Sequence, residues 1–99
     1  MSITSKSGSS NTEVVISVSG NFDHSTRNKF TLVYKKYPRG SKRFVVDFKE
    51  TTYLDSAALG LLLELREYSC KNAVELVNGS ESIREIFQIA YFYQLFTIR

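Results

Sequence analysis

A chain of 99 residues and net charge +3 fits a single domain, and its 42% hydrophobic content, with six tyrosines and seven phenylalanines, can form a core without metal ions or disulfides. Cys70 is the only cysteine and residues Met1 to Lys6 lack the long apolar run of a signal peptide, so we expect a cytoplasmic protein. No apolar stretch approaches the roughly 20 residues that span a bilayer, and no nucleic-acid-binding motif is present, so neither membrane insertion nor a nucleic-acid partner is expected.

The first third of the chain predicts a strand and then a helix. Residues 5–11 are mostly Ser, Gly and Asn and predict a loose turn or tail, so that residues 1–11 form either a short edge strand or a loose segment. The β-branched run at 14–18 predicts a buried strand that Gly20 and Asn21 end. Residues 23–26 offer N-cap oxygens to a helix whose apolar positions recur every three or four residues: Phe30, Val33, Tyr34 and Tyr37.

Pro38 and Gly40 end this helix, and basic residues gather around the turn. They are Lys35, Lys36, Arg39, Lys42 and Arg43. Such a cluster can attract an anionic surface. Cations near a helix C-terminus also offset the negative end of the helix dipole, and we favour this simpler interpretation.

The middle of the chain predicts a second strand and an apolar helix. Residues 43–48 have the composition of a strand, and the polar segment 49–52 separates it from Tyr53, Leu54, Asp55 and Ser56. Residues 57–67 are rich in Ala, Leu, Glu and Arg, which strongly favour a helix. Their leucines cover more than one face, so this helix is buried on several sides or keeps apolar surface for a partner.

The last third predicts a strand at 73–77, a turn at 78–80, and a one-sided helix marked by Ile83, Ile86, Phe87 and Ala90. The aromatic segment 91–98 predicts a final strand that closes the core. Alternation of strands and helices implies crossover connections, so we expect an α/β fold with a mainly parallel sheet of four to five strands and three to four helices.

Asp23 and Ser56 both stand where a strand passes into a helix, which is where α/β sheets tend to bind ligands or partners. Either Asp55 or Ser56 can cap the second of these helices, because each has an oxygen near the unpaired N–H groups of the first turn. A phosphate on Ser56 would also suit this position, since free N–H groups and the positive end of the helix dipole favour negative charge.

The segment Tyr53-Leu54-Asp55-Ser56-Ala57-Ala58-Leu59-Gly60 resembles the signature of the STAS domain family, the bacterial anti-sigma factor antagonists, whose usual form is Asp-Ser-Ser-Gly-Leu-Gly after a short apolar stretch. Two further segments are similar: Gly20 to Thr26 resembles the family's Gly-x-Leu-Asp, and 76–89 has its spacing from strand to apolar helix. Together the matches extend from Val14 to Ile98.

The resemblance implies a single STAS domain over residues 1–99 that is switched by phosphorylation of Ser56. Its unphosphorylated form binds an anti-sigma factor or switch serine kinase, a PP2C-type phosphatase restores it, and it is a monomer when free. Neither catalytic residues, nor a metal, nor a cofactor is implied. The residues expected to bind the partner are Asp23, Asp55, Ser56, Ala57, Ala58 and Leu59.

Two residues depart from the family signature: Ala57 replaces a second serine and Ala58 replaces a glycine. Ser56 is then the one hydroxyl of the motif, and alanine should stiffen the start of the helix. Two alternatives remain open. In one, His24 beside Asp23 activates Ser56 in an enzyme, although no nucleophile elbow, phosphate loop or zinc spacing is present. In the other, the chain is a constitutive STAS accessory subunit of a transport ATPase complex.

Overall fold

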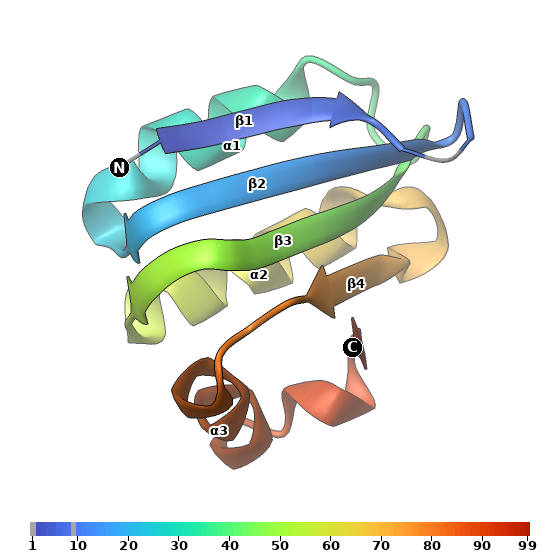
Figure 1. Ribbon diagram of the computed structural model, residues 1–99. Coiled ribbons are helices and arrows are strands. Elements are labelled where there is room, and N and C mark those ends of the chain that lie inside the picture. Colours follow the sequence, from blue (N-terminus) through green and yellow to red (C-terminus); the bar gives the residue numbers. More distant parts are fainter. Residues whose placement is uncertain (1, 9) are drawn as a thin grey trace.

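Runs of β-branched and aromatic residues form a mixed sheet, and two of the segments between its strands lie behind one of its faces as helices (Figure 1). The computed structural model describes residues 2–8 and 10–99. In these residues the strands are β1 (Ser2–Ser7), β2 (Glu13–Phe22), β3 (Arg43–Leu54), β4 (Val74–Val77) and β5 (Thr97–Ile98). The α-helices are α1 (Arg27–Lys35), α2 (Ser56–Tyr68) and α3 (Glu81–Ile89), with short 3-10 helices η1 (His24–Thr26), η2 (Cys70–Asn72) and η3 (Phe92–Gln94).

The described strands form one five-stranded sheet in the order β1-β2-β3-β4-β5. Only the pairing of β1 with β2 is antiparallel; the other three pairs are parallel. Because parallel neighbours need crossovers, α1 and α2 lie together behind the sheet, whereas α3 lies below β4 (Figure 1). The predicted α/β fold, with a mainly parallel sheet and three helices, is confirmed.

Phenylalanine side chains form the centre of the core. All seven phenylalanines are buried. Ring contacts with centroids 4.9–6.1 Å apart join α1, β2, β3, α3 and η3 in one chain of aromatic pairs: Phe30–Phe22, Phe22–Phe48, Phe48–Phe87, Phe87–Phe92 and Phe92–Phe96. Such pairs add roughly 0.5–1.5 kcal/mol each beyond the burial of area.

Helix α2 buries one stripe of side chains against this core at i, i+3, i+4 and i+7, namely Ala58, Leu61, Leu62 and Leu65. Leu63 lies outside the stripe and is 39% exposed. The wide distribution of leucines in this helix therefore leaves some apolar surface uncovered. None of the helices in the described part of the chain is long and apolar enough to cross a membrane.

Strand β3 is longer than the sequence predicts, because the polar segment 49–52 belongs to it. Its register against β2 shifts twice, between Ser17 and Ser19 and between Gly20 and Asn21, and each shift inserts one extra residue into β3. The buried Thr51 hydroxyl donates to the carbonyl of Val18 over 2.7 Å. The polar residues are thus accommodated by bulges and one internal hydrogen bond instead of forming a loop.

At the N-terminal end, residues 5–7 belong to the edge strand β1, which was one of the two alternatives for residues 1–11, and not to the loose turn predicted for 5–11; pairing with β2 orders this polar segment. The C-terminal end differs from the prediction. The predicted final strand at 91–98 is mostly η3 and a turn, and only Thr97 and Ile98 pair with β4. Phe92 and Phe96 are buried nevertheless, so this segment closes the core as expected.

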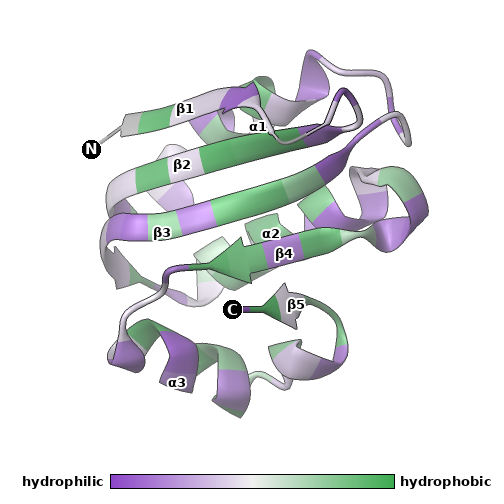
Figure 2. Cartoon of the chain, turned by 45° about the vertical axis from the view of Figure 1, so that its right-hand side comes forward, coloured by the Kyte–Doolittle hydropathy of each residue, from purple (hydrophilic) through white to green (hydrophobic). Residues whose placement is uncertain are grey.

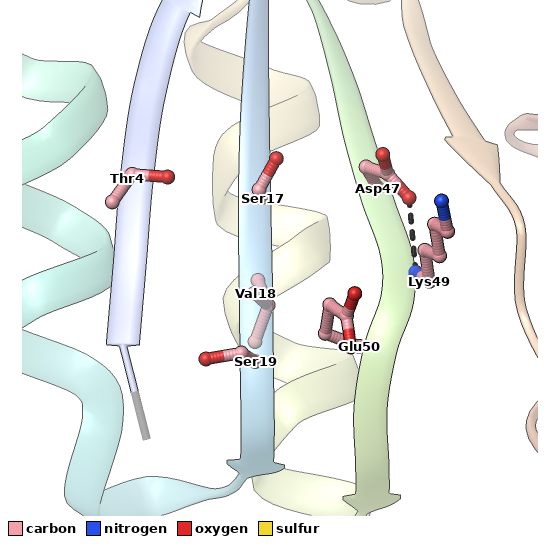
Figure 3. A pocket seen from close by; sticks show the side chains of 7 residues that line it. All are labelled: Thr4, Ser17, Val18, Ser19, Asp47, Lys49 and Glu50. Carbon is pink, nitrogen blue, oxygen red and sulfur yellow. Dashed lines mark hydrogen bonds between the residues drawn. The ribbon is translucent and has the colours of Figure 1, made fainter.

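The face of the sheet opposite α1 and α2 is open and more polar. In Figure 2 the hydrophobic residues concentrate in the middle of the strands, whereas hydrophilic residues fill most of the loops. A shallow pocket of about 300 Å³ lies on this face and includes Ser17, Asp47 and Glu50 (Figure 3).

The Asp47 carboxylate accepts hydrogen bonds from the Lys49 N–H over 2.9 Å and the Asn78 amide over 3.1 Å. Asp47 thereby ties β3 to the turn after β4, and none of the predicted site residues lines the pocket.

Candidate functional site

The loops that follow β2 and β3 meet at the carboxyl edge of the sheet. Phe22 and Leu54 are register partners, and the N–H of Asp55 donates to the carbonyl of Phe22 over 3.3 Å. Asp23 directly follows Phe22, and Asp55 directly follows Leu54. The parallel register therefore brings the loops that carry these two predicted partner-binding residues side by side.

Asp55, and not Ser56, caps helix α2. The Asp55 backbone is extended and its Oδ1 accepts from the N–H of Ala58 over 3.0 Å. Ser56 is the first helical residue, it is exposed, and its hydroxyl makes no hydrogen bond to any residue that the structure describes. The choice between the two caps is therefore settled, and Ser56 presents an unengaged hydroxyl to solvent.

Asp23 caps the first 3-10 turn in the same manner. Its Oδ1 accepts from both the N–H and the hydroxyl of Ser25, and its carbonyl accepts from the Thr26 hydroxyl over 2.7 Å. The hydrogen bond from the Ser25 side chain is the main reason that the pKa of Asp23 lies below its ordinary value of 3.8, because it stabilises the ionised form. The Asp23 side chain consequently carries a negative charge at neutral pH.

The other residues expected to bind a partner lie at different depths. Ala57 and Leu59 are half-buried, whereas Ala58 is fully buried and belongs to the core. The methyl group of Ala58 is therefore not part of the surface, and its N–H is the group that Asp55 caps.

Sequence reasoning did not single out three residues whose positions extend the surface around Ser56. Gly60 and Leu63 lie four and seven residues after Ser56, a spacing that puts them on the same side of α2, and both are exposed. Tyr53, at the end of β3, is 53% exposed. The spacing of 56, 60 and 63 places these residues on one side of a helix, but the sequence does not show which side is exposed. That side is identified by the buried stripe at 58, 61, 62 and 65.

His24, considered as a possible base for Ser56, is exposed in η1. No hydrogen bond joins it to Ser56 in the described part of the chain. Among the described residues, no group of three or more His, Cys, Asp or Glu side chains has a geometry that could hold a metal ion.

A mixed five-stranded sheet, three helices and a serine at the start of the second helix define a small α/β domain with a SpoIIAA-like fold. The family model described as "Mlab, STAS domain" matches residues 6–96, and the chain belongs to this family. The resemblance found in the sequence is thus confirmed.

Individual relatives agree with the family assignment. The chain is 39% identical over 100 residues to a STAS-domain containing protein of Pseudomonas aeruginosa (strain UCBPP-PA14), with 99% of each chain covered. Its fold is similar to that of an anti-sigma factor antagonist from Mycobacterium paratuberculosis, with a TM-score of 0.75, 22% identity, and coverage of 98% of this chain and 85% of that one. The Bacillus cell fate determinant SpoIIAA in its phosphorylated form gives a TM-score of 0.65 at 21% identity, covering 99% and 91% of the two chains. At these identities the two solved structures support the fold alone.

Proposed function

We propose that this chain is an anti-sigma factor antagonist-like regulator of a partner-switching pathway. In its unphosphorylated form it binds an anti-sigma factor or switch serine kinase, phosphorylation of Ser56 releases it, and a PP2C-type phosphatase restores it. The proposal includes a cytoplasmic location, a monomeric free state and no catalytic activity. The observation that carries it is the Ser56 hydroxyl, which is exposed and makes no hydrogen bond to the described residues because Asp55 caps the helix in its place.

The first turn of α2 can accept a phosphate without rebuilding. Of its N–H groups, that of Ala58 is taken by Asp55, whereas those of Ser56 and Ala57 precede the first intrahelical hydrogen bonds and point toward the helix start. A phosphate there also lies at the positive end of the helix dipole. Phosphorylation should consequently leave the backbone of α2 in place.

The switch then acts through charge and bulk at the surface. A phosphate adds about −1.5 to −2 charges at neutral pH, beside the carboxylate of Asp55 and close to the loop of Asp23. An acidic or closely packed partner surface on Leu59, Gly60 and Leu63 would be repelled. One protein with a similar fold, the Bacillus cell fate determinant SpoIIAA, has a solved structure described as its phosphorylated form, and this precedent is in line with the proposal.

The decisive experiment combines mass spectrometry with two Ser56 variants. Protein isolated from its native cells should contain a species heavier by about 80 Da, localised to Ser56 and absent in Ser56→Ala. In pull-downs, Ser56→Ala should retain the switch kinase, whereas Ser56→Asp should lose it. Ser82→Asp is the matched control, because it adds the same charge to an exposed serine in the first turn of α3.

Equal binding of the kinase by Ser56→Ala and Ser56→Asp would refute the switch. Unmodified protein that co-purifies with a transport ATPase would support the accessory-subunit alternative in its place. Hydrolysis of generic ester or nucleotide substrates by wild type, lost in Ser56→Ala, would instead indicate an enzyme.

A further inference from the structure

Five cations gather at the end of the molecule away from Ser56. They are Lys35, Lys36, Arg39, Lys42 and Lys71, here called the basic end, and they come from the end of α1, the following loop and η2. Backbone hydrogen bonds fasten these segments together, from Gly40 N–H to the Tyr68 carbonyl over 2.9 Å and from Cys70 N–H to the Lys42 carbonyl over 2.7 Å. Helix α2 runs from Ser56 to Tyr68, so about 20 Å separate the two regions.

Helix α1 and the loop after it, which supply four of the five cations, carry no acidic residue; the acidic residues nearby come from α2, where Glu64 lines the same surface hollow as Lys35 and Glu67 precedes Lys71 by four residues. Between Asp23 and Asp47 the chain has seven Lys and Arg residues and no Asp or Glu. Ion pairs in the described part of the chain join Arg27 to Glu64 and Arg99 to Glu75, and neither involves the basic end. Arg43 is left out of the set, because Glu13 is its register partner on β2.

The surroundings of these cations disfavour a nucleic acid. Lys36 and Lys42 lie over the ring of Tyr37 at 5.6 and 5.8 Å, and Arg39 lies over the ring of Tyr68 at 5.8 Å. The tyrosine rings are thus already covered by side chains of the protein. Single-stranded nucleic acids bind through aromatic rings that are open to stacking, which this surface does not offer.

The composition of the basic end also disfavours the core of a protein interface. Such cores are enriched in aromatic residues and depleted in lysine, whereas three of these five cations are exposed lysines, at 35, 36 and 71. Among the described residues, no exposed large hydrophobic side chain lies within 36–43 or 69–73. Leu32, 71% exposed and one turn before Lys36, is a single apolar contact.

We propose that the basic end binds the anionic headgroups of a lipid membrane, so that the domain is held peripherally at a membrane surface without insertion. Clusters of four to eight basic residues that lie beside a membrane have this property, and each lysine near an anionic membrane surface contributes about 1 kcal/mol, or roughly fivefold in partitioning. Because Ser56 lies at the other end of α2, membrane contact leaves the proposed switch accessible. The inference does not depend on the function proposed for Ser56.

Vesicle co-sedimentation of the full chain tests this directly. The probes are vesicles of equal parts phosphatidylglycerol and phosphatidylcholine, with pure phosphatidylcholine vesicles for comparison. The test variant is Lys35→Gln/Lys36→Gln/Lys71→Gln and its matched control is Lys6→Gln/Lys29→Gln/Lys49→Gln. All six lysines are exposed, and each variant lowers the net charge from +3 to 0, by one unit at each of three positions.

Wild type should bind the anionic vesicles and not the neutral ones, and binding should weaken steeply between about 0.1 M and 0.5 M salt. The test variant should partition to the anionic vesicles on the order of 100-fold less than wild type. The control variant should lose far less partitioning, because its three lysines lie outside the basic end although its net charge is the same. Equal losses in the two variants, or equal binding to neutral vesicles, would overturn the proposal. The proposal would also be overturned if wild type bound a single-stranded oligonucleotide at protein concentrations that give no binding to the anionic vesicles. Circular dichroism must show that both variants are folded, and Lys35→Arg/Lys36→Arg/Lys71→Arg should restore binding if charge is responsible.

Discussion

Removal of the Asp55 side chain tests whether Asp55 caps helix α2 and leaves the Ser56 hydroxyl free. In Asp55→Ala the N–H of Ala58 loses its 3.0 Å partner, and the loss of an N-cap costs about 1 kcal/mol. The carboxylate also interacts favourably with the dipole of α2, which contributes roughly 0.3–1 kcal/mol more. We therefore expect the free energy of unfolding to fall by about 1–2 kcal/mol, with Tm lower by about 5–15 °C for a domain of this size.

Urea denaturation followed by circular dichroism measures this difference, and two further variants make it specific. Asp55→Asn keeps the cap acceptor and should lose only about 0.5 kcal/mol, because only the charge is removed. Ser56→Ala should stay within about 0.5 kcal/mol of wild type, because its hydroxyl makes no hydrogen bond to the described residues. If Ser56→Ala cost as much as Asp55→Ala, Ser56 would be the cap and the case for a free acceptor hydroxyl would be lost.

Three other predictions concern the rest of the domain. Gly60→Ala should raise the free energy of unfolding by up to about 1 kcal/mol in urea denaturation, since Gly60 is helical and exposed and an added Cβ would meet nothing within 4 Å; destabilisation would contradict this. Ser25→Ala should raise the pKa of Asp23 in an NMR titration, because the main hydrogen bond that lowers it is lost. A carboxyl group whose pKa is lower in the folded than in the unfolded chain stabilises the fold above its unfolded pKa, and this contribution is lost as pH falls through the folded pKa. Wild type should therefore lose more stability than Ser25→Ala on acidification below about pH 4, and parallel pH profiles would refute the assignment. Phe48→Ala should cost about 3–5 kcal/mol, because its ring contacts both Phe22 and Phe87; a loss below about 1 kcal/mol would show that the core refills the space.

The sequence predicted the elements whose apolar residues follow a clear period. The strand at 14–18 and the helices around Phe30, in 57–67 and around Ile83 are all present, because their burial depends on spacing along one segment. Segments whose structure depends on other parts of the chain were predicted less well. Residues 5–7 are polar and form a strand only because β2 supplies the partner.

The same distinction explains the errors at 49–52 and 91–98. The segment 49–52 looks like a loop by composition, and the two extra residues that keep it in β3 are visible only in the register with β2. In 91–98, aromatic content favours a strand, but Tyr91 adopts a left-handed backbone with φ 60° that turns the chain into η3. A tyrosine does not predict such a turn, because glycine or asparagine usually occupies the left-handed position.

At the candidate site, the sequence named candidate residues, and the structure assigns the cap of α2 among them. Both Asp55 and Ser56 had the chemistry of a cap, and only the backbone at Asp55 decides between them. Ala58 was grouped with its neighbours by the motif, yet its position on the buried stripe of α2 removes its side chain from the surface.

The edges of the sheet affect how this chain behaves at high concentration. An edge strand presents unpaired N–H and C=O groups that can recruit a second chain into a growing sheet. Here β5 offers two residues, and β1 is a polar strand that carries an exposed lysine, Lys6. Neither edge gives an incoming strand a long apolar template, so the fold resists uncontrolled strand-to-strand aggregation.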